Sequence, residues 1–176
     1  MRRGRRLNTR HAIIDSPVGE LTLVAHGGAL VGVYFRHHWY RPSADTFGPI
    51  VEAQTDDVLA ESQAQLNDYL TGRRTEFDLP TVLRGEDMQR RVWDRLTAIP
   101  FGETVTYGEL AAELDDGTTA QEVGAAVGRN PLSIVVPCHR VIGKNGKLTG
   151  YAGGLKRKKF LLDLEEPAEL REARLF

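Results

Sequence analysis

The chain changes its pattern once, near its middle, and this change most constrains the fold. Segments typical of β-strands and a single helical segment precede residues 79–84, and helical spacing dominates after them. Pro80 interrupts regular structure at this point, and polarity rises. Strands followed by helices predict an α+β protein. We therefore expect an N-terminal α/β structural domain over residues 1–80 and a mostly helical C-terminal domain over residues 81–176.

The first domain is predicted to be a small sheet covered by a helix. Three runs of apolar or alternating residues predict an antiparallel meander: 11–15, 21–26 and 29–36. Residues 36–55 show little periodicity and are expected to be a loop. Apolar residues then recur at helical spacing over residues 56–70, before Gly72.

The second domain is predicted to contain a helix-turn-helix. Helical spacing extends over four segments: 86–99, 107–114, 119–128 and 155–164. The second and third are short and flank a turn that contains Gly117, the pattern of a helix pair that can enter a DNA groove. Many helical hairpins bind nothing, so this pattern alone is weak. Asn145-Gly146 predicts a β-hairpin over residues 141–151.

Charge is distributed unevenly, although the net charge is only -1. Residues 7–80 carry five basic and ten acidic side chains. Residues 123–162 carry no acid and eight basic side chains: Arg129, Arg140, Lys144, Lys147, Lys156, Arg157, Lys158 and Lys159. This asymmetry indicates a polyanion-facing surface in the second half. A solvated helix face with a basic hairpin would give the same counts.

A single cysteine limits the chemistry. One thiol excludes an intrachain disulfide and the usual zinc sites that need two or more thiolates, so we expect no metal and no cofactor. The basic start, MRRGRR, is not followed by the apolar run of a secretory signal, and no stretch reaches membrane-spanning length. We therefore expect a cytoplasmic protein that does not enter membranes.

The residues around the cysteine suggest a nucleophile. Pro137 fixes the backbone before Cys138, and His139 and Arg140 follow. His139 and the nearby positive charge could lower the thiol pKa, and the Glu165 carboxylate could orient the imidazole. Neighbouring side chains rarely face each other, so we expect His139 to reach Cys138 through one water. A buried, inert cysteine remains an alternative, because free cysteine is among the most buried residue types.

Several motifs together resemble those of the O6-alkylguanine-DNA alkyltransferases. Asn130-Pro131, PCHRV from Pro137 and YAGGL from Tyr151 occur in that family's order and spacing, and SPVGELTLV resembles the start of its bacterial members. The resemblance covers roughly residues 88–165. It implies a ribonuclease-H-like fold for the first domain and direct repair of DNA by transfer of an alkyl group to a cysteine.

The resemblance also implies roles for individual residues. Cys138 corresponds to the alkyl acceptor, His139 to its water-linked base, Glu165 to the carboxylate of the relay, and Tyr107 to the acid that protonates the departing guanine. Asn130 corresponds to the residue that braces the turn before the nucleophile. The expected base pocket consists of Tyr151, Ala152, Gly153, Val135 and Val136.

Double-stranded DNA is the expected partner, bound through its minor groove. The residues expected to contact it are Thr119, Ala120, Gln121, Gly124, Ala125, Arg129 and Arg140. The small residues Gly124 and Ala125 would permit close approach of the helix backbone, although a Gly/Ala face can also serve tight helix packing. Gln121 departs from the family pattern, which has an arginine that fills the gap left by the flipped base.

The expected reaction is irreversible. A thioether is not hydrolysed under cellular conditions, so each molecule would act once, on O6-alkylguanine and possibly on O4-alkylthymine. We expect a monomer, with cooperative binding along DNA left open. Two other functions remain: a non-catalytic helix-turn-helix protein that binds alkyl lesions, and a cysteine hydrolase that uses Cys138 and His139 but has no evident oxyanion hole.

Overall fold

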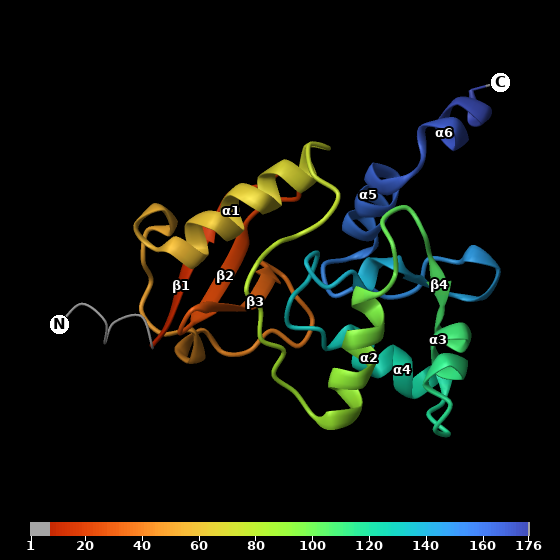
Figure 1. The fold of residues 1–176 in the computed structure, drawn as a ribbon, viewed down its shortest axis with the longest axis horizontal. Coiled ribbons are helices and arrows are strands. Elements are labelled where there is room, and N and C mark those ends of the chain that lie inside the picture. Colours follow the sequence, from red (N-terminus) through yellow and green to blue (C-terminus); the bar gives the residue numbers. More distant parts are fainter. Residues whose placement is uncertain (1–7, 176) are drawn as a thin grey trace.

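The computed structural model describes residues 8–175, which form a sheet-containing lobe beside a helical lobe (Figure 1). The basic N-terminal hexapeptide lies outside the described residues. None of the helices within residues 8–175 is long and apolar enough to cross a lipid bilayer.

The sheet-containing lobe has a three-stranded antiparallel sheet in the order β1-β2-β3. Its strands are β1 (Thr9–Ile14), β2 (Leu21–His26) and β3 (Ala29–Phe35). Helix α1 (Asp57–Leu70) packs on the sheet, and the Asp56 carboxylate caps it by accepting hydrogen bonds from the backbone N–H groups of Val58 and Leu59. Two short 3-10 helices, η2 (Ala44–Phe47) and η3 (Ala53–Thr55), lie in the connection. The predicted meander and helix are therefore confirmed.

The helical lobe contains the predicted helix-turn-helix. Its helices are α2 (Asp87–Thr97), α3 (Tyr107–Leu114), α4 (Ala120–Gly128), α5 (Leu155–Glu165) and α6 (Ala168–Arg174). Thr106 and Thr119 begin α3 and α4 with capping boxes, and Gly117 adopts a left-handed φ of 88° in the turn between them. The indole N–H of Trp93 in α2 donates to the Ala126 carbonyl oxygen at 2.8 Å. This bond fixes α4 against α2.

The hairpin predicted around Asn145-Gly146 is wrong, although its turn forms. Asn145 and Gly146 have φ values of 64° and 77°, in the short 3-10 segment η5 (Lys144–Gly146). The strand before the turn, β5 (Val141–Ile142), pairs in parallel with β4 (Val105–Thr106) instead. After the turn, the carbonyl oxygens of Thr149 and Gly150 accept hydrogen bonds from Lys158 Nζ at 2.9 and 3.3 Å. The Gly143 N–H still donates to the Lys147 carbonyl oxygen across the turn at 2.7 Å, but residues 147–150 form no second strand and the last two are held against α5.

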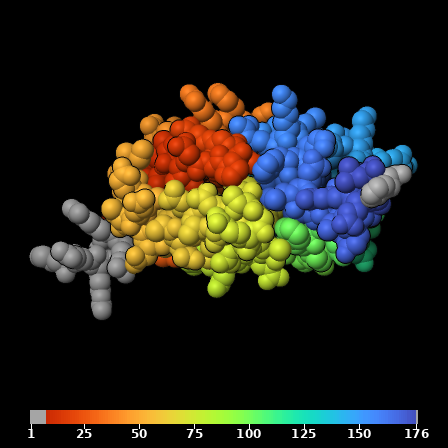
Figure 2. All heavy atoms as spheres, turned by 90° about the horizontal axis from the view of Figure 1, so that it is seen from above, coloured from red at the N-terminus to blue at the C-terminus, as the bar shows by residue number. Residues whose placement is uncertain are grey.

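The two lobes share one apolar core, which positions residues of both around the same site. The Val33 N–H in β3 donates to the Pro131 carbonyl oxygen at 2.8 Å, and Arg157 Nε in α5 donates to the Val18 carbonyl oxygen at 2.7 Å. Figure 2 shows α5 against the first strands. The segment that joins the lobes is itself paired with β3, through hydrogen bonds of Leu30 to Pro80 and Val82. The domain boundary after residue 80 remains a prediction.

Candidate active site

Cys138 lies at the start of a short 3-10 turn, η4 (Cys138–Arg140). The loop that precedes this turn is strained and determines where the thiol lies. The Asn130 side chain braces this loop: its Nδ2 donates to the Val136 carbonyl oxygen at 2.9 Å, and its Oδ1 accepts from the Leu132 N–H at 3.0 Å. Ile134, between them, has a φ of 73°, which is costly for a β-branched residue. The loop therefore holds the thiol in one place, and Asn130 makes the bracing contacts that the family resemblance implies.

Glu165, at the end of α5, accepts hydrogen bonds from three side chains near Cys138. Its Oε2 accepts from the Tyr69 hydroxyl at 2.9 Å and from His139 Nε2 at 2.8 Å. Its Oε1 accepts from Arg140 Nε at 2.5 Å. All of these residues are buried. The relay predicted between His139 and Glu165 thus forms, with Tyr69 and Arg140 as further members.

The charges in this cluster fix the protonation of His139. Burial acts to raise the pKa of Glu165, but the hydrogen bonds and charges of His139 and Arg140 outweigh it and hold that pKa below its usual value. Burial lowers the pKa of His139, against the hydrogen bond and charge of Glu165. A neutral imidazole that donates from Nε2 to an ionised carboxylate carries its lone pair on Nδ1. Nδ1 is buried and makes no hydrogen bond to any described protein group, so it is available as a base.

The thiol itself differs from the expectation of a lowered pKa. Burial raises the pKa of Cys138, while a hydrogen bond from Asn130 and the positive charge of Lys158 act in the opposite direction. Cys138 is 3% exposed, and water stabilises a thiolate poorly there. At neutral pH the sulfur therefore carries its proton, and its activation depends on a base. Lys158, not His139, is the cation that lowers the cost of the thiolate.

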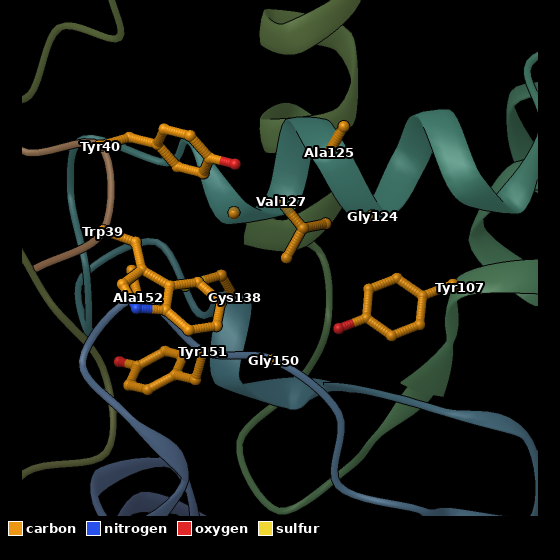
Figure 3. Close-up of a pocket in the computed structure, with 11 residues that line it drawn as sticks. Trp39, Tyr40, Tyr107, Gly124, Ala125, Val127, Cys138, Gly150, Tyr151 and Ala152 are labelled. Atoms are coloured by element: carbon orange, nitrogen blue, oxygen red, sulfur yellow. The ribbon is translucent and has the colours of Figure 1, made fainter.

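A cavity of about 140 Å³ opens beside Cys138 (Figure 3). Tyr107, at the start of α3, and Tyr151 face it from two sides, and the small residues Gly124 and Ala125 of α4 border it. Burial raises the pKa of Tyr107, so its hydroxyl keeps its proton at neutral pH. The cavity thus brings a thiol, a phenol and a helix face with small side chains together.

Not every residue expected in the pocket borders this cavity. Ala152 does, but Val135, Val136 and Gly153 do not. Val136 is buried in the core, and Val135 packs against that core. A Cβ on Gly153 would lie 2.5 Å from a ring carbon of Phe35, so this glycine permits close packing on β3.

Six of the seven residues expected to contact DNA lie on or beside one helix. Ala120, Gln121 and Ala125 are exposed on α4, Gly124 is half-buried, and exposed Thr119 and Arg129 flank the helix. Arg140 is the exception and corrects the expectation: its side chain is 10% exposed, and its Nη1 donates to the Ile99 carbonyl oxygen at 2.6 Å. With Nε bound to Glu165, Arg140 stabilises the relay and is not placed to contact a phosphate.

Sequence reasoning missed four residues of this site. Tyr69 arrives from α1 at a spacing of 96 residues from Glu165, so no local pattern links them. Lys158 was counted as a surface cation but is fully buried. Trp39 and Tyr40 line the cavity from the loop after β3, which was assigned no role. Two adjacent aromatic residues in an otherwise polar loop were the available signal.

Comparison with known families agrees with this geometry. The description "6-O-methylguanine DNA methyltransferase, DNA binding domain" matches residues 87–167, and the ribonuclease-like domain of the same family matches residues 9–83. The chain belongs to the 6-O-methylguanine DNA methyltransferase family. The resemblance inferred from the sequence motifs and the α+β fold class are therefore confirmed.

Relatives of this methyltransferase match along most of their length. A methylated-DNA–protein-cysteine methyltransferase of Mycobacterium bovis is 48% identical over 160 residues, which cover 89% of this chain and 94% of the relative. One from Methanosarcina acetivorans is 41% identical over 155 residues, which cover 88% and 97%. The crystal structure of Mycobacterium tuberculosis OGT in complex with DNA superposes with a TM-score of 0.78 at 44% identity, covering 92% of this chain and 97% of that one.

Proposed function

We propose that this methyltransferase repairs duplex DNA by moving an alkyl group from O6 of guanine to the sulfur of Cys138. Methyl transfer to a protein cysteine is the activity for which its relatives are named. The observation that carries the assignment to Cys138 is its position: the single cysteine of the chain borders the same cavity as Tyr107 and the small-residue face of α4.

The residues around the cavity suit each step of the reaction. His139 Nδ1 takes the thiol proton through a water, and the Glu165 carboxylate stabilises the resulting imidazolium through Nε2. The thiolate attacks the alkyl carbon, a C–S bond forms, and the electrons of the broken C–O bond pass to the guanine. Tyr107 donates a proton to the departing base, and its phenolate recovers one from the imidazolium by way of solvent. The stable thioether ends the activity of that molecule.

The position of the cavity supports extrusion of the damaged nucleotide. A thiol that is 3% exposed cannot meet a base inside a duplex, so the nucleotide must rotate out, at a cost of a few kcal/mol. The family resemblance implies that α4 lies in the minor groove, and Gly124 and Ala125 would allow the close approach that this requires beside the cavity mouth. Gln121 is exposed on this helix and would contact the base opposite the gap through its amide.

Intact mass spectrometry tests the proposal. After incubation with a duplex that carries one O6-methylguanine, the protein should gain one methyl group in place of one hydrogen, in a stoichiometric and irreversible reaction. Cys138→Ala should show no gain. An unmodified wild-type protein after complete binding would contradict alkyl transfer and favour a lesion-binding protein. A parallel duplex with O4-methylthymine determines whether that lesion is also a substrate.

The remaining proposals concern the setting of this reaction. We propose a cytoplasmic protein that acts as a monomer, because the thiol, the His139–Glu165 relay and Tyr107 are all supplied by one chain and the proposed reaction needs no group from a second copy. The His139–Glu165 relay and the thiol supply the chemistry without a metal or cofactor. Sedimentation velocity of the free protein and of its DNA complex tests the monomer and reveals any cooperative assembly.

A further inference from the structure

The loop after β3 places two exposed aromatic side chains at the mouth of the cavity. We call residues 36–42 the aromatic loop. Trp39 is 58% exposed and Tyr40 is 61% exposed, yet both border the cavity that contains Cys138 (Figure 3). Large exposed aromatic residues at the rim of a pocket are typical of binding surfaces.

Several contacts hold the aromatic loop in this position. The backbone N–H of Trp39 donates to the Ala152 carbonyl oxygen at 3.1 Å, which ties the loop to the segment that follows Tyr151. A Cβ on Gly150 would lie 3.8 Å from a ring carbon of Trp39, so the indole lies beside the backbone of Gly150. Tyr40 adopts a left-handed φ of 57°, a strained conformation for a tyrosine. Tyr40 keeps this strained conformation at the point where its ring contacts the C-terminal end of α4.

Tyr40 is paired with a cation from the helix assigned to DNA. The guanidinium carbon of Arg129 lies 4.1 Å from the centroid of the Tyr40 ring. A Cβ on Gly128 would lie 3.9 Å from the same ring. The end of α4 and the aromatic loop therefore form one continuous rim. Trp39 has no comparable cation over its ring among the described residues, and its 58% exposure leaves much of the side chain accessible.

We propose that Trp39 stacks on the extruded alkylguanine and that Tyr40, braced by Arg129, positions Trp39 at the mouth. This inference rests on the proposed function, and it gives the sheet-containing lobe a direct role in substrate binding. An aromatic ring can stack on any base, and the purine is the occupant that must reach Cys138. Such stacking also holds the nucleotide outside the duplex, which compensates for Gln121 at the position of the family's arginine.

Tryptophan fluorescence tests the contact directly. The chain has two tryptophans, and Trp93 is 2% exposed, so Trp39 dominates the emission that a collisional quencher can reach. In a Cys138→Ala background, a duplex with O6-methylguanine should quench Trp39 and protect it from acrylamide. The same duplex without the lesion should do neither, and Trp39→Phe should remove the change. Equal acrylamide access with and without lesion DNA would overturn the inference.

Single-turnover kinetics distinguishes stacking of Trp39 on the base from a role in which Trp39 only lines the cavity with apolar surface. Trp39→Leu keeps an apolar side chain but removes the aromatic face, and Trp39→Phe keeps a smaller face. The protein concentration at half-maximal rate should rise about 5- to 150-fold in Trp39→Leu, equivalent to ~1–3 kcal/mol of stacking. In Trp39→Phe the rise should be smaller. Exposed His37, which does not border the cavity, provides the matched control His37→Leu.

The outcomes distinguish this inference from the proposed function. Methyl transfer by the wild type with unchanged half-saturation in Trp39→Leu would overturn the stacking role and leave the repair reaction intact. Failure of the wild type to accept a methyl group would overturn the reaction, while the fluorescence experiment would still decide whether Trp39 contacts the lesion. Equal losses in Trp39→Leu and Trp39→Phe would indicate a steric role and would also contradict stacking.

Discussion

At the scale of single residues, Glu165 determines how the thiol can be activated. It accepts hydrogen bonds from Tyr69, His139 and Arg140, and the described residues offer no other carboxylate to His139. The thiol keeps its proton because burial raises the pKa of Cys138. His139 must therefore already have a free lone pair on Nδ1 when the alkyl group arrives. The buried carboxylate ensures this by holding the proton of His139 on Nε2.

Tyr69→Phe should destabilise the protein, because it removes a buried donor to a charged acceptor. We expect the free energy of unfolding to fall by about 1.5–3 kcal/mol in urea titrations. Tyr151→Phe is the matched control: its buried hydroxyl makes no hydrogen bond within the described part of the chain, so the change should be close to zero. Equal effects of the two substitutions would show that the Tyr69–Glu165 bond contributes no net stability.

The rate of alkyl transfer should be flat through pH 6.5 at saturating protein. Burial lowers the pKa of His139 from the usual 6.5, so the imidazole stays neutral as pH falls past that value. The same sign applies to stability: the unfolded chain binds the proton first, so stability is full above pH 6.5 and decreases as pH falls below it. Rapid-quench measurements across this range check the rate. A half-maximal rate at the ordinary histidine pKa would contradict a buried neutral base.

At the scale of elements, α4 both packs on the core and borders the cavity, and we propose that it also contacts DNA. Val123, Ala126 and Val127 are buried against the core, while Gly124 and Ala125 border the cavity. A glycine in a helix costs about 0.5–1 kcal/mol relative to alanine. Gly124 is therefore placed at a position where packing alone would favour a larger residue.

Gly124→Ala should stabilise the fold and weaken DNA binding. The added Cβ would meet a Tyr107 ring carbon at 3.7 Å, an ordinary contact, so we expect about 0.5–1 kcal/mol of added stability. The extra methyl should lower affinity for duplex DNA, measured by fluorescence anisotropy. Gly108→Ala in α3, an exposed helical position that does not border the cavity, should stabilise the fold without this loss. Equal affinity of both variants would remove α4 from the interface.

Sequence patterns predicted where helices and turns lie better than which distant segments they contact. Gly117 and the apolar spacing predicted α3 and α4 within one residue at each boundary. The Asn145-Gly146 turn was also correct, but its hairpin was not, because Lys158 is a distant partner for the carbonyls that follow the turn. Motifs placed Cys138 and His139 together, whereas Tyr69 and Trp39 enter the site through tertiary contacts that no local spacing encodes.

At the scale of the whole molecule, the structure reduces the eight cations counted in the second lobe to five exposed ones. Of the eight cations between residues 123 and 162, Arg140 and Lys158 are buried, and Arg157 donates to backbone oxygens of Val18 and Gly153. Burial lowers the pKa of Lys158 to about 8. The exposed cations that remain are Arg129, Lys144, Lys147, Lys156 and Lys159. Counting charge along the sequence could not separate these two groups.

The salt dependence of DNA binding should reflect these five exposed cations. If all of them contact phosphates, the log-log slope reaches about -4.5, and fewer contacts make it shallower. Lys144→Gln with Lys147→Gln should reduce the slope by up to about 2. Arg73→Gln with Arg74→Gln, in the other lobe, should leave it unchanged. A steeper slope in the wild type would require cations outside this segment.

The shared core predicts cooperative unfolding of both lobes. Trp93, in a Trp39→Phe background, reports on the helical lobe through fluorescence, and far-UV circular dichroism reports on the whole chain. The two signals should change at the same urea concentration in a single transition. Separate transitions would support independent domains on either side of residue 80 and would show that the contacts of Val33 with the Pro131 loop are weak.

The Tyr69–Glu165 bond has a consequence for protein engineering. A self-labelling tag trimmed to the segment from α2 onward would keep the thiol and α4 but lose the Tyr69 hydroxyl, which donates a hydrogen bond to the Glu165 carboxylate. Such a tag would also lose the indole beside the reactive sulfur. Miniaturisation of this protein therefore has to supply a substitute donor and a substitute ring before the segment that precedes α2 is discarded.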